Sequence, residues 1–561
     1  MPLSVEQLAP IRHDGHVAVI AGPGSGKTRV LVAAIALALE EVKWPRSVAC
    51  ITYSKECVRE LEQRLSNMGV VNEKGIFVGT VHSFSLTRII KPFASCVPKF
   101  LPQVYRVATE SELDSCKRRA SQNCPAANIH QALKMRRSSF ERSVDWRASD
   151  PVSARYIDTY ESILRSEGLI DYDDMPLLAY KLLKIDWIRK AVRAWYPRIF
   201  VDEYQDLGVV LNSLVELLCL SGERNASRLF AVGDIDQAIY SFTGATPHLF
   251  KELALRQDVA DFYLYQNYRS GEMIVRASLG ALGKEREYLC GESVGEFRFC
   301  NIKGDTYAQS QFVVSKLLPD LMNRFPLEKI GILYREAWVG DRLSSELETN
   351  AIPYVRCDKK AIIPRSSSLG QFLISCTEWY SLDDESKPLL RDVVRLAYNV
   401  FGFDEKDELE ESLFEFLTTT PSNSAFEWLL AFSSWSLKWR ELDATNGDDW
   451  ALLDKLLAIS NPINGSIPLQ SIIPQQEAIQ LSTFHSSKGR EFDAVILLGM
   501  DSGIFPGSFD TSDTKIEEAR RLMYVGVTRA RFELYCVFNH NNYSPWLPEL
   551  KKRLNLQAPP A

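Results

Sequence analysis

Residues 16–41 place a lysine and a threonine where they could hold the phosphates of a nucleotide. The stretch HVAVIAGPGSGKTRVLVAAIALALEE predicts an apolar strand, a glycine-rich turn and a long apolar helix. The turn has the phosphate-loop pattern, formed by Ala21, Gly22, Pro23, Gly24, Ser25, Gly26, Lys27 and Thr28. Its glycines let successive backbone N–H groups point at phosphate oxygens at a helix N-terminus. Lys27 would contact the β- and γ-phosphates of ATP, and Thr28 would ligate Mg²⁺.

The stretch WYPRIFVDEYQD places two carboxylates directly after a second predicted strand, formed by residues 199–201. Asp202 would hold Mg²⁺ through water, and Glu203 would polarise the attacking water as a general base. A pair of acids at a strand end is a weak signal alone. Downstream of a phosphate loop, it predicts ATP hydrolysis.

Residues 233–245, GDIDQAIYSFTGA, combine two kinds of chemistry in one short loop. The acids and Gln237 are typical of a strand end that meets a charged ligand. Tyr240 and Phe242 are typical of a platform for flat rings, because a base stacks on any aromatic face with ~1–3 kcal/mol. The alternative for either ring is packing in the core.

These stretches belong to an ordered series that resembles the UvrD/PcrA/Rep branch of superfamily 1 DNA helicases. The other members of the series are CITYSKECVRELEQRL, VGTVHSFS, IDYDDM, LYQNYRS, IGILYREAW with IPYVRCD, LSTFHSSKGREFDAVIL and EEARRLMYVGVTRARFEL. The resemblance implies an α/β fold of two RecA-like parallel-sheet cores, each interrupted by a helical insertion, with ATP in the cleft between them.

The resemblance also implies contacts to the base and sugar of ATP. Gln7 occupies the position of the family's adenine-reading glutamine. Arg29 and Tyr268 would flank the adenine, with Tyr268 stacking on it, and Glu491 would meet the ribose.

Three further positions match family contacts to the γ-phosphate. Gln237 and Arg269 would touch it directly, and Arg529 would enter from the second core as an arginine finger. Fixed cations beside the γ-phosphate can raise the rate of hydrolysis by a factor of ~10³–10⁵, because the transition state spreads negative charge over the phosphoryl oxygens. In isolation, Arg529 would read as an ordinary surface residue of a helix.

Six residues match family positions that contact DNA, namely Tyr53, His82, Phe84, Tyr240, Phe242 and His485. Because Gln237 and the two rings share one loop, a movement of Gln237 on hydrolysis would reach the residues that grip DNA. The expected partner is therefore single-stranded or tailed duplex DNA.

The expected organisation has four parts. They are a first core (residues 1–90 and 166–265), a basic helical insertion (91–165), a second core (266–358 and 472–561) and a short helical insertion (359–471). The last insertion is amphipathic and rich in aromatic residues, which predicts packing, or alternatively a surface for a partner.

The sequence departs from the family in three places. Thr243 stands where an arginine is usual, and Arg490 stands where leucine is commoner. The insertion at 359–471 is shorter than the family's duplex-contacting domain and lacks its Gly-Ile-Gly signature.

Composition narrows the class of protein. The 561 residues carry a net charge of −7, and nine lysines and arginines between positions 117 and 155 offer either a local basic surface or a solvated helical face. No apolar run approaches the ~18 residues of a membrane span, and no signal peptide is visible at the N-terminus. Eleven scattered cysteines without a CxxC spacing predict a reduced cytoplasmic protein rather than a zinc or iron–sulfur protein.

Two functions fit these observations. The first is an ATP-dependent DNA helicase or single-strand translocase that moves 3′ to 5′. The second is a nucleotide-gated DNA sensor that signals to a nuclease subunit. The short second insertion resembles compact family members found beside OLD-type nucleases in phage defence, the Gabija B subunits. A non-catalytic scaffold fits poorly, because every residue needed for turnover is present.

Overall fold

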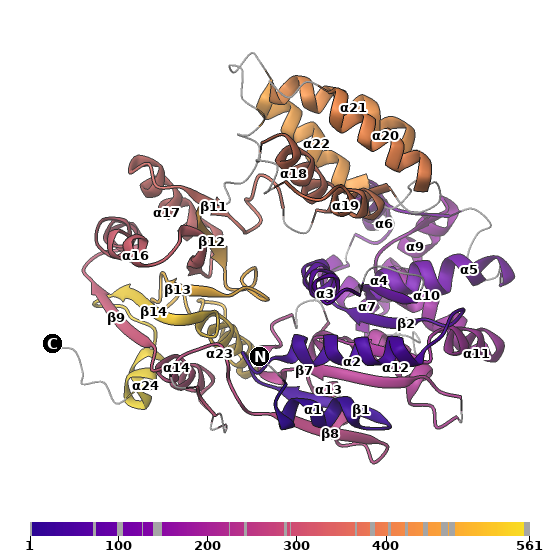
Figure 1. Ribbon diagram of the computed structural model, residues 1–561, viewed down its shortest axis with the longest axis horizontal. Coiled ribbons are helices and arrows are strands. Elements are labelled where there is room, and N and C mark those ends of the chain that lie inside the picture. The colour runs from indigo at the N-terminus through magenta and orange to yellow at the C-terminus, as the bar shows by residue number, and fades with distance from the viewer. Residues whose placement is uncertain are drawn as a thin grey trace.

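The computed structural model describes residues 3–70, 75–97, 105–125, 127–138, 148–223, 225–240, 244–284, 286, 289–291, 293–364, 367–381, 387–401, 406–420, 424–440, 447–461, 469 and 477–554. Two six-stranded sheets organise these residues, and every strand pair in both sheets is parallel. Figure 1 shows the two sheets in neighbouring bodies, with the phosphate-loop helix α2 (Lys27–Glu41) in the first.

The first sheet has the strand order β3 (Ile76–Thr80), β2 (Val48–Thr52), β6 (Arg198–Val201), β7 (Arg228–Gly233), β1 (His16–Ala21) and β8 (Val259–Leu264). Alternate residues of β1 enter two different clusters: Val17 and Val19 pack with α2, and Ala18 and Ile20 pack on the opposite face. Because helices cover both faces of this parallel sheet, both faces of β1 are buried, and its sequence HVAVIA is a nearly unbroken apolar run.

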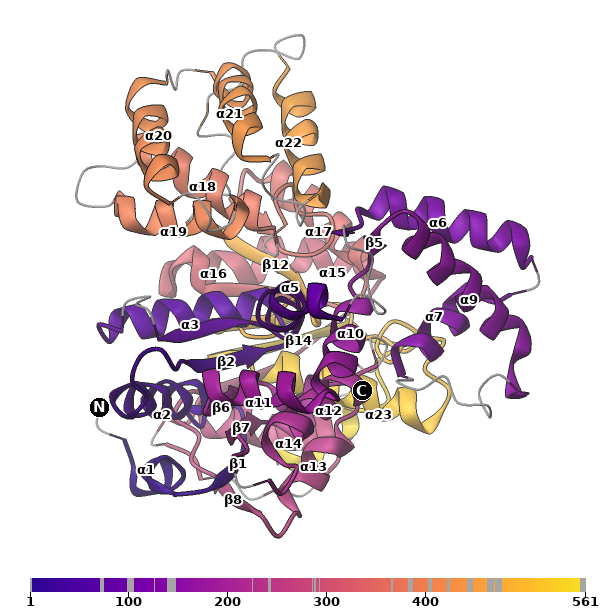
Figure 2. The ribbon, with the colours of Figure 1, turned by 90° about the vertical axis from the view of Figure 1, so that its right-hand side faces the viewer.

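The helices of the first body are α1 (Val5–Arg12), α2, α3 (Lys55–Asn67), α4 (Val81–Phe84), α5 (Lys91–Phe93), α10 (Asp174–Leu183), α11 (Asp186–Trp195), α12 (Val209–Cys219) and α13 (His248–Ala254). Three more, α6 (Glu110–Asn123), α7 (Ile129–Ser138) and α9 (Pro151–Ser166), come between β3 and β6 in the sequence and pack around their own buried cluster. They project from the sheet beside the short pair β4 (Arg106–Val107) and β5 (Leu169–Ile170) (Figure 2).

The second sheet has the order β11 (Tyr354–Arg356), β12 (Ile479–Thr483), β10 (Ile330–Tyr334), β13 (Phe492–Leu497), β14 (Ala530–Asn539) and β9 (Glu296–Ile302). Its helices are α14 (Glu272–Leu282), α15 (Thr306–Phe312), α16 (Leu318–Arg324), α17 (Ala337–Thr349), α23 (Asp513–Val527) and α24 (Leu547–Arg553). As in the first sheet, neighbouring residues of β10 enter clusters on opposite faces. The predicted pair of RecA-like α/β cores is confirmed.

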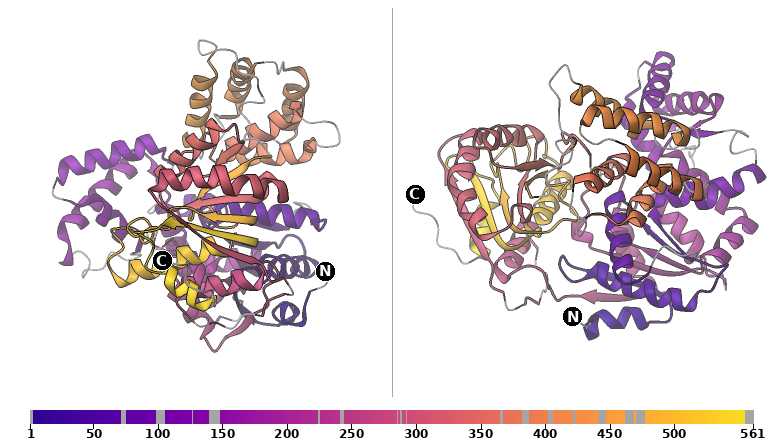
Figure 3. Two further views of the ribbon diagram at one scale, coloured as in Figure 1. Left: turned by 90° about the vertical axis from the view of Figure 1, so that its left-hand side faces the viewer. Right: turned by 45° about the horizontal axis from the view of Figure 1, so that its top comes forward.

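Five helices come between β11 and β12: α18 (Ser368–Ser381), α19 (Leu390–Phe401), α20 (Lys406–Thr419), α21 (Ala425–Arg440) and α22 (Gly447–Ser460). They form a separate body beside both cores (Figure 3). Trp428 and Phe432 of α21 stack on one another inside this body, 5.5 Å apart, and are fully buried. The predicted packing role of these aromatic residues is confirmed.

Candidate functional site: a nucleotide pocket joined to an aromatic loop

The phosphate loop connects β1 to α2 and has the shape of an anion cradle. Gly24 and Gly26 adopt φ values of 70° and 84°, which residues with a side chain rarely adopt. A Cβ added at Gly24 would lie 2.6 Å from Asn267 Oδ1, so the loop also has no room for one. The ammonium group of Lys27 is buried without a hydrogen-bond partner among the described residues. Such a group fits a loop that is completed by phosphate oxygens.

Gln7 lies directly on this loop. Its side-chain amide donates from Nε2 to the carbonyl oxygen of Ser25 at 3.0 Å, and its Oε1 accepts from the backbone N–H of Ser4 at 3.2 Å. Gln7 therefore caps helix α1 and braces the phosphate loop at once. Arg29 and Tyr268, the expected neighbours of the adenine, are both exposed.

The two predicted acids stand at the carboxyl end of β6, next to β7 and one strand from β1. Glu203 adopts φ 51°, a left-handed conformation that is costly for a residue with a side chain. Burial opposes ionisation of Glu203, but Lys27 and Lys488 outweigh it and hold its pKa well below the ordinary value. Burial and the charge of Glu203 raise the pKa of Asp202. Glu203 is therefore the ionised member of the pair, as a general base requires.

Gln205 connects these acids to the next strand, and the sequence analysis did not single it out. Its Nε2 donates to the carboxylate of Glu203, and its Oε1 accepts from the backbone N–H of Asp234 at 2.9 Å. The contact needs glycine at position 233, where a Cβ would lie 2.4 Å from that oxygen. Gln205 thereby links Glu203, the predicted general base, to the 234–240 loop.

Asn267 is a second residue that the sequence analysis missed. Its Nδ2 donates to the carbonyl of Pro23 at 3.0 Å, and its Oδ1 accepts from the backbone N–H of Arg269 at 2.8 Å. The backbone N–H of Tyr268 donates to the carbonyl of Gly24 at 2.8 Å. These hydrogen bonds hold the segment after β8 against the phosphate loop. The motif LYQNYRS, which contains Asn267, was the sequence feature that could have indicated this residue.

The cationic residues expected at the γ-phosphate already have protein partners. Arg269 forms an ion pair with Glu491 of the second core. The buried guanidinium of Arg529 donates to the carbonyls of Val525 and Arg490 at 2.9 and 3.1 Å and to the Thr528 hydroxyl at 3.1 Å. Burial and the nearby Arg269 lower the pKa of Arg529 to about 10. Both arginines lie at the seam between the cores, and both would exchange present partners for phosphate oxygens.

Lys488 of the second core contacts several residues of the first. Its ammonium group donates to Asp206 Oδ2 at 2.5 Å and to the carbonyl of Gln237 at 3.0 Å, and it lies 3.6 Å from Glu203. Burial opposes its charge, but Asp206 and Glu203 outweigh burial and raise its pKa. The same ammonium lies 5.2 Å from the ring centre of Tyr240, within cation–π range.

Four of the six predicted DNA-contact residues lie in three different surroundings. Tyr53 and Tyr240 come together, with ring centres 5.6 Å apart, although they belong to different segments. His82 is partly buried and meets the exposed ring of Tyr172 edge-on at 5.7 Å, so Tyr172 of IDYDDM is a further candidate. His485 is partly buried, and burial lowers its pKa to about 4, which leaves it neutral at neutral pH.

The structure contradicts the expectation for Phe84. Its ring is 2% exposed and packs against Phe77 and Tyr196 in the core of the first body. A ring enclosed on all sides cannot stack on a base, so Phe84 is a packing residue. Phe242 and Thr243 lie outside the described residues.

The basic stretch between positions 117 and 155 is compensated in large part by acidic neighbours. Arg136 is buried and pairs with Asp171 at 2.7 Å and Asp174 at 2.5 Å. Three exposed cations also have acidic partners: Lys117 pairs with Asp114, Arg119 with Glu167 and Arg137 with Asp173. Arg142 and Arg147 lie outside the described residues. At least four of the nine cations therefore have acidic partners, which weakens the local basic surface that the sequence offered as one of two alternatives.

None of the helices in the described ranges is both long and apolar enough to cross a membrane.

The fold and the site define a protein with a phosphate loop, in which the candidate nucleotide-binding residues lie where two parallel-sheet cores meet. Comparison with known families agrees: residues 3–258 match the UvrD/REP helicase N-terminal domain and residues 433–541 match the UvrD-like helicase C-terminal domain. These two matches together cover more than half of the chain, which belongs to the UvrD-like family of superfamily 1 helicases.

Individual relatives are similar over nearly the whole chain. The ATP-dependent DNA helicase Rep of Buchnera aphidicola is 26% identical, and the alignment covers 97% of this chain and 96% of that protein. Rep of Escherichia coli is 25% identical, with 93% and 88% covered, and the ATP-dependent DNA helicase PcrA of Staphylococcus aureus is 24% identical, with 93% and 81% covered.

Proposed function

We propose that this protein is an ATP-dependent DNA helicase that moves 3′ to 5′ along single-stranded DNA. The observation that carries the proposal is the 234–240 loop, in which Gln237 and Tyr240 both touch Lys488 of the second core. One cation of the second core therefore contacts both the phosphate-facing and the base-facing part of a single loop of the first.

The chemistry of ATP hydrolysis follows from the residues at the end of β6. Thr28 and Asp202 are oxygen ligands of the kind Mg²⁺ prefers, and Mg²⁺ supplies charge neutralisation between the phosphates. Lys27 and the backbone N–H groups of the loop hold the phosphates. Glu203, kept ionised by Lys27 and Lys488 and oriented by Gln205, accepts the proton of the attacking water.

Closure of the two cores supplies the remaining cations. Arg269 leaves Glu491, and Arg529 leaves its backbone acceptors, so that both meet the oxygens of the transferred phosphoryl group. Arginines that reach the γ-phosphate only in the closed state can raise the rate of phosphoryl transfer by a factor of ~10³–10⁵. ATP hydrolysis is thereby tied to the relative position of the cores.

Movement on DNA follows because the same closure displaces Lys488 relative to the first core. Lys488 carries the Gln237 backbone and the Tyr240 ring with it, and Tyr240 lies against Tyr53. Aromatic rings grip any base, so the displacement advances the strand without reading its sequence.

The proposal is tested with strand displacement on duplexes that carry either a 3′ or a 5′ single-stranded tail. ATP-dependent unwinding of the 3′-tailed duplex alone is expected, since the protein would load on the tail and travel towards the duplex. Lys27→Ala serves as the matched inactive protein. Unwinding from the 5′ tail, or displacement that persists in Lys27→Ala, contradicts the proposal.

A second candidate is a nucleotide-gated DNA sensor that signals to a nuclease subunit, as in Gabija-type phage defence. The short insertion favours it, because its five helices bury several of their aromatic residues in their own core and the sequence lacks the family's duplex-contact signature. This candidate predicts DNA-stimulated ATP hydrolysis with little unwinding, and a nuclease gene beside this one. Efficient unwinding by the purified protein alone would decide against it.

A further inference from the structure

Asp234, the second residue of the 233–245 loop, is a meeting point of the two cores. Its carboxylate is fully buried. From the first core, Gln237 Nε2 donates to its Oδ2 at 3.1 Å, and the backbone N–H of Asp236 donates to its Oδ1 at 3.2 Å. From the second core, Arg286 Nη1 donates to Oδ1 at 3.0 Å, and the Tyr524 hydroxyl donates to Oδ2 at 3.4 Å.

Arg286 is the ion-pair partner that the described residues give to this buried carboxylate. The same Nη1 lies 2.8 Å from Asp236 Oδ2, and the guanidinium is 19% exposed. A buried carboxylate is stable in its charged form only when it is paired and hydrogen-bonded. The Asp234 carboxylate, which accepts from the Gln237 amide, is therefore also held by a cation of the other core.

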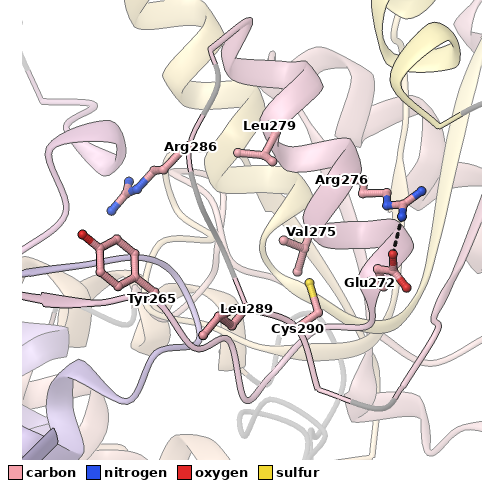
Figure 4. Close-up of a pocket in the computed structure, with 8 residues that line it drawn as sticks. All are labelled: Tyr265, Glu272, Val275, Arg276, Leu279, Arg286, Leu289 and Cys290. Carbon is pink, nitrogen blue, oxygen red and sulfur yellow. Dashed lines mark ion pairs between the residues drawn. The ribbon is translucent and has the colours of Figure 1, made fainter. Parts of the chain in front are cut away.

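Arg286 lies at the edge of an open cavity of about 480 Å³, which is lined by Tyr265, Leu279 and Leu289 among others (Figure 4). Tyr524 lies on α23, which ends two residues before Arg529. A shift of this helix would therefore change the contact to Asp234 and the position of Arg529, the arginine expected at the γ-phosphate, together.

We infer that Arg286 is a positioning residue that couples the two cores through Asp234, holding the Gln237 side chain in place until the cores move. When the cores close on nucleotide, Arg286 shifts relative to Asp234, and the Gln237 amide is released to the γ-phosphate. Without Arg286, the Asp234 carboxylate loses its cation, and of the two contacts to the second core named above only the longer one, from the Tyr524 hydroxyl, remains. This inference rests on the proposed DNA-stimulated ATP hydrolysis, and it gives a role to a residue outside the family's motifs.

The test compares Arg286→Gln with Arg276→Gln. Arg276 lines the same cavity but pairs with Glu272 within its own helix, which makes it a matched control. The ATPase kcat and KM are measured without DNA and with saturating oligo-dT, and the affinity for oligo-dT is measured with and without a non-hydrolysable ATP analogue.

Arg286→Gln should lower the DNA stimulation of kcat by at least ~5-fold, the lower end of typical coupling between two sites. The effect of the analogue on DNA affinity should shrink as well, and the effect of DNA on the affinity for the analogue should shrink by the same factor, since coupling between binding sites is reciprocal. The KM for ATP without DNA should stay near the wild-type value. Arg286→Lys should retain part of the coupling because it keeps the charge, and Arg276→Gln should retain all of it.

Wild-type stimulation in Arg286→Gln would overturn the inference, and so would a proportional loss of basal and stimulated rates, which indicates a structural role only. If Arg286→Gln does not fold, Tyr524→Phe and Arg286→Lys decide: reduced stimulation in both supports the inference, and full stimulation in both overturns it. A wild-type protein that DNA does not stimulate would instead refute the proposed function.

Discussion

The ammonium group of Lys488 lies 2.5 Å from a carboxylate oxygen of Asp206, although the two residues are 282 positions apart and belong to different sheets. Asp206 follows the acidic pair at the end of β6, and Lys488 follows β12. Burial raises the pKa of Asp206 to about 6, and the cation of the other core opposes that rise. The ion pair therefore joins the segment after β6, where the proposed base Glu203 lies, to the other core.

Replacement of Lys488 by methionine should uncouple DNA binding from ATP hydrolysis. Methionine keeps the length of the side chain but leaves Asp206 and Glu203 without their shared cation, which is costly for buried carboxylates. DNA-stimulated ATPase should fall by at least ~10-fold, within the usual range of coupling between sites. Arg490→Met is the control, because Arg490 donates to Gln480 within the second core. Equal effects of the two substitutions would show that Lys488 has no special role.

Lys27→Ala should abolish ATP hydrolysis and leave single-stranded DNA binding largely intact. The ammonium group is buried in the phosphate loop, where the described residues offer it no hydrogen-bond partner, whereas the aromatic candidates for DNA contact belong to other segments. The two measurements are the steady-state ATPase rate and the affinity for a labelled oligonucleotide. Hydrolysis at the wild-type rate would refute the assignment of the phosphate loop.

Arg529→Ala should lower kcat by at least ~10³ with a modest change in nucleotide affinity, as expected for a cation that acts in the transition state. The present contacts of Arg529 are to backbone carbonyls and a hydroxyl, so it reaches phosphate only after closure. Single-turnover hydrolysis and nucleotide binding separate the two effects. A variant that loses affinity but turns over normally would make Arg529 a ground-state ligand.

Tyr240→Ala should weaken single-stranded DNA binding by ~1–3 kcal/mol, the usual value of one stacked base. Tyr53→Ala should do the same, and the double variant should lose less than the sum, because the two rings touch. Tyr263→Ala is the control, since this exposed ring stacks on Tyr265 at the edge strand β8. A full additive loss would indicate two independent contacts.

His485→Gln should reduce the acid sensitivity of the fold. Burial, assisted by Arg335, lowers the pKa of His485 from its ordinary 6.5 to about 4. Between these values the unfolded chain binds more protons than the folded one, so stability falls as pH drops through this window. Thermal unfolding of both proteins at about pH 7.5 and about pH 5 measures the effect. The variant should lose less stability than the wild type, and an equal loss would contradict the buried, neutral state of His485.

The separate chemical elements of this protein could be read from the sequence. The phosphate loop is local, because HVAVIA, the glycines and Lys27 are consecutive and their strand–turn–helix geometry needs no distant partner. The acids after β6 and the two-core architecture followed from the ordered series of family motifs. Tyr53 and Tyr240 were also predicted, each from its own motif.

Only the tertiary structure decided which of these elements touch. Phe84 is buried against Phe77 and Tyr196. The motif VGTVHSFS could not predict this burial, because it depends on how the segments that carry these rings pack together. Lys488 and Arg286 were not predicted as site residues, because an isolated lysine or arginine reads as a solvated surface charge until its acidic partner is located. Those partners, Asp206 and Asp234, stand at the ends of β6 and β7 in the other sheet. Contacts between the two cores depend on how the cores pack against each other. The local sequence gives the types of the residues but not the distances between residues of different cores.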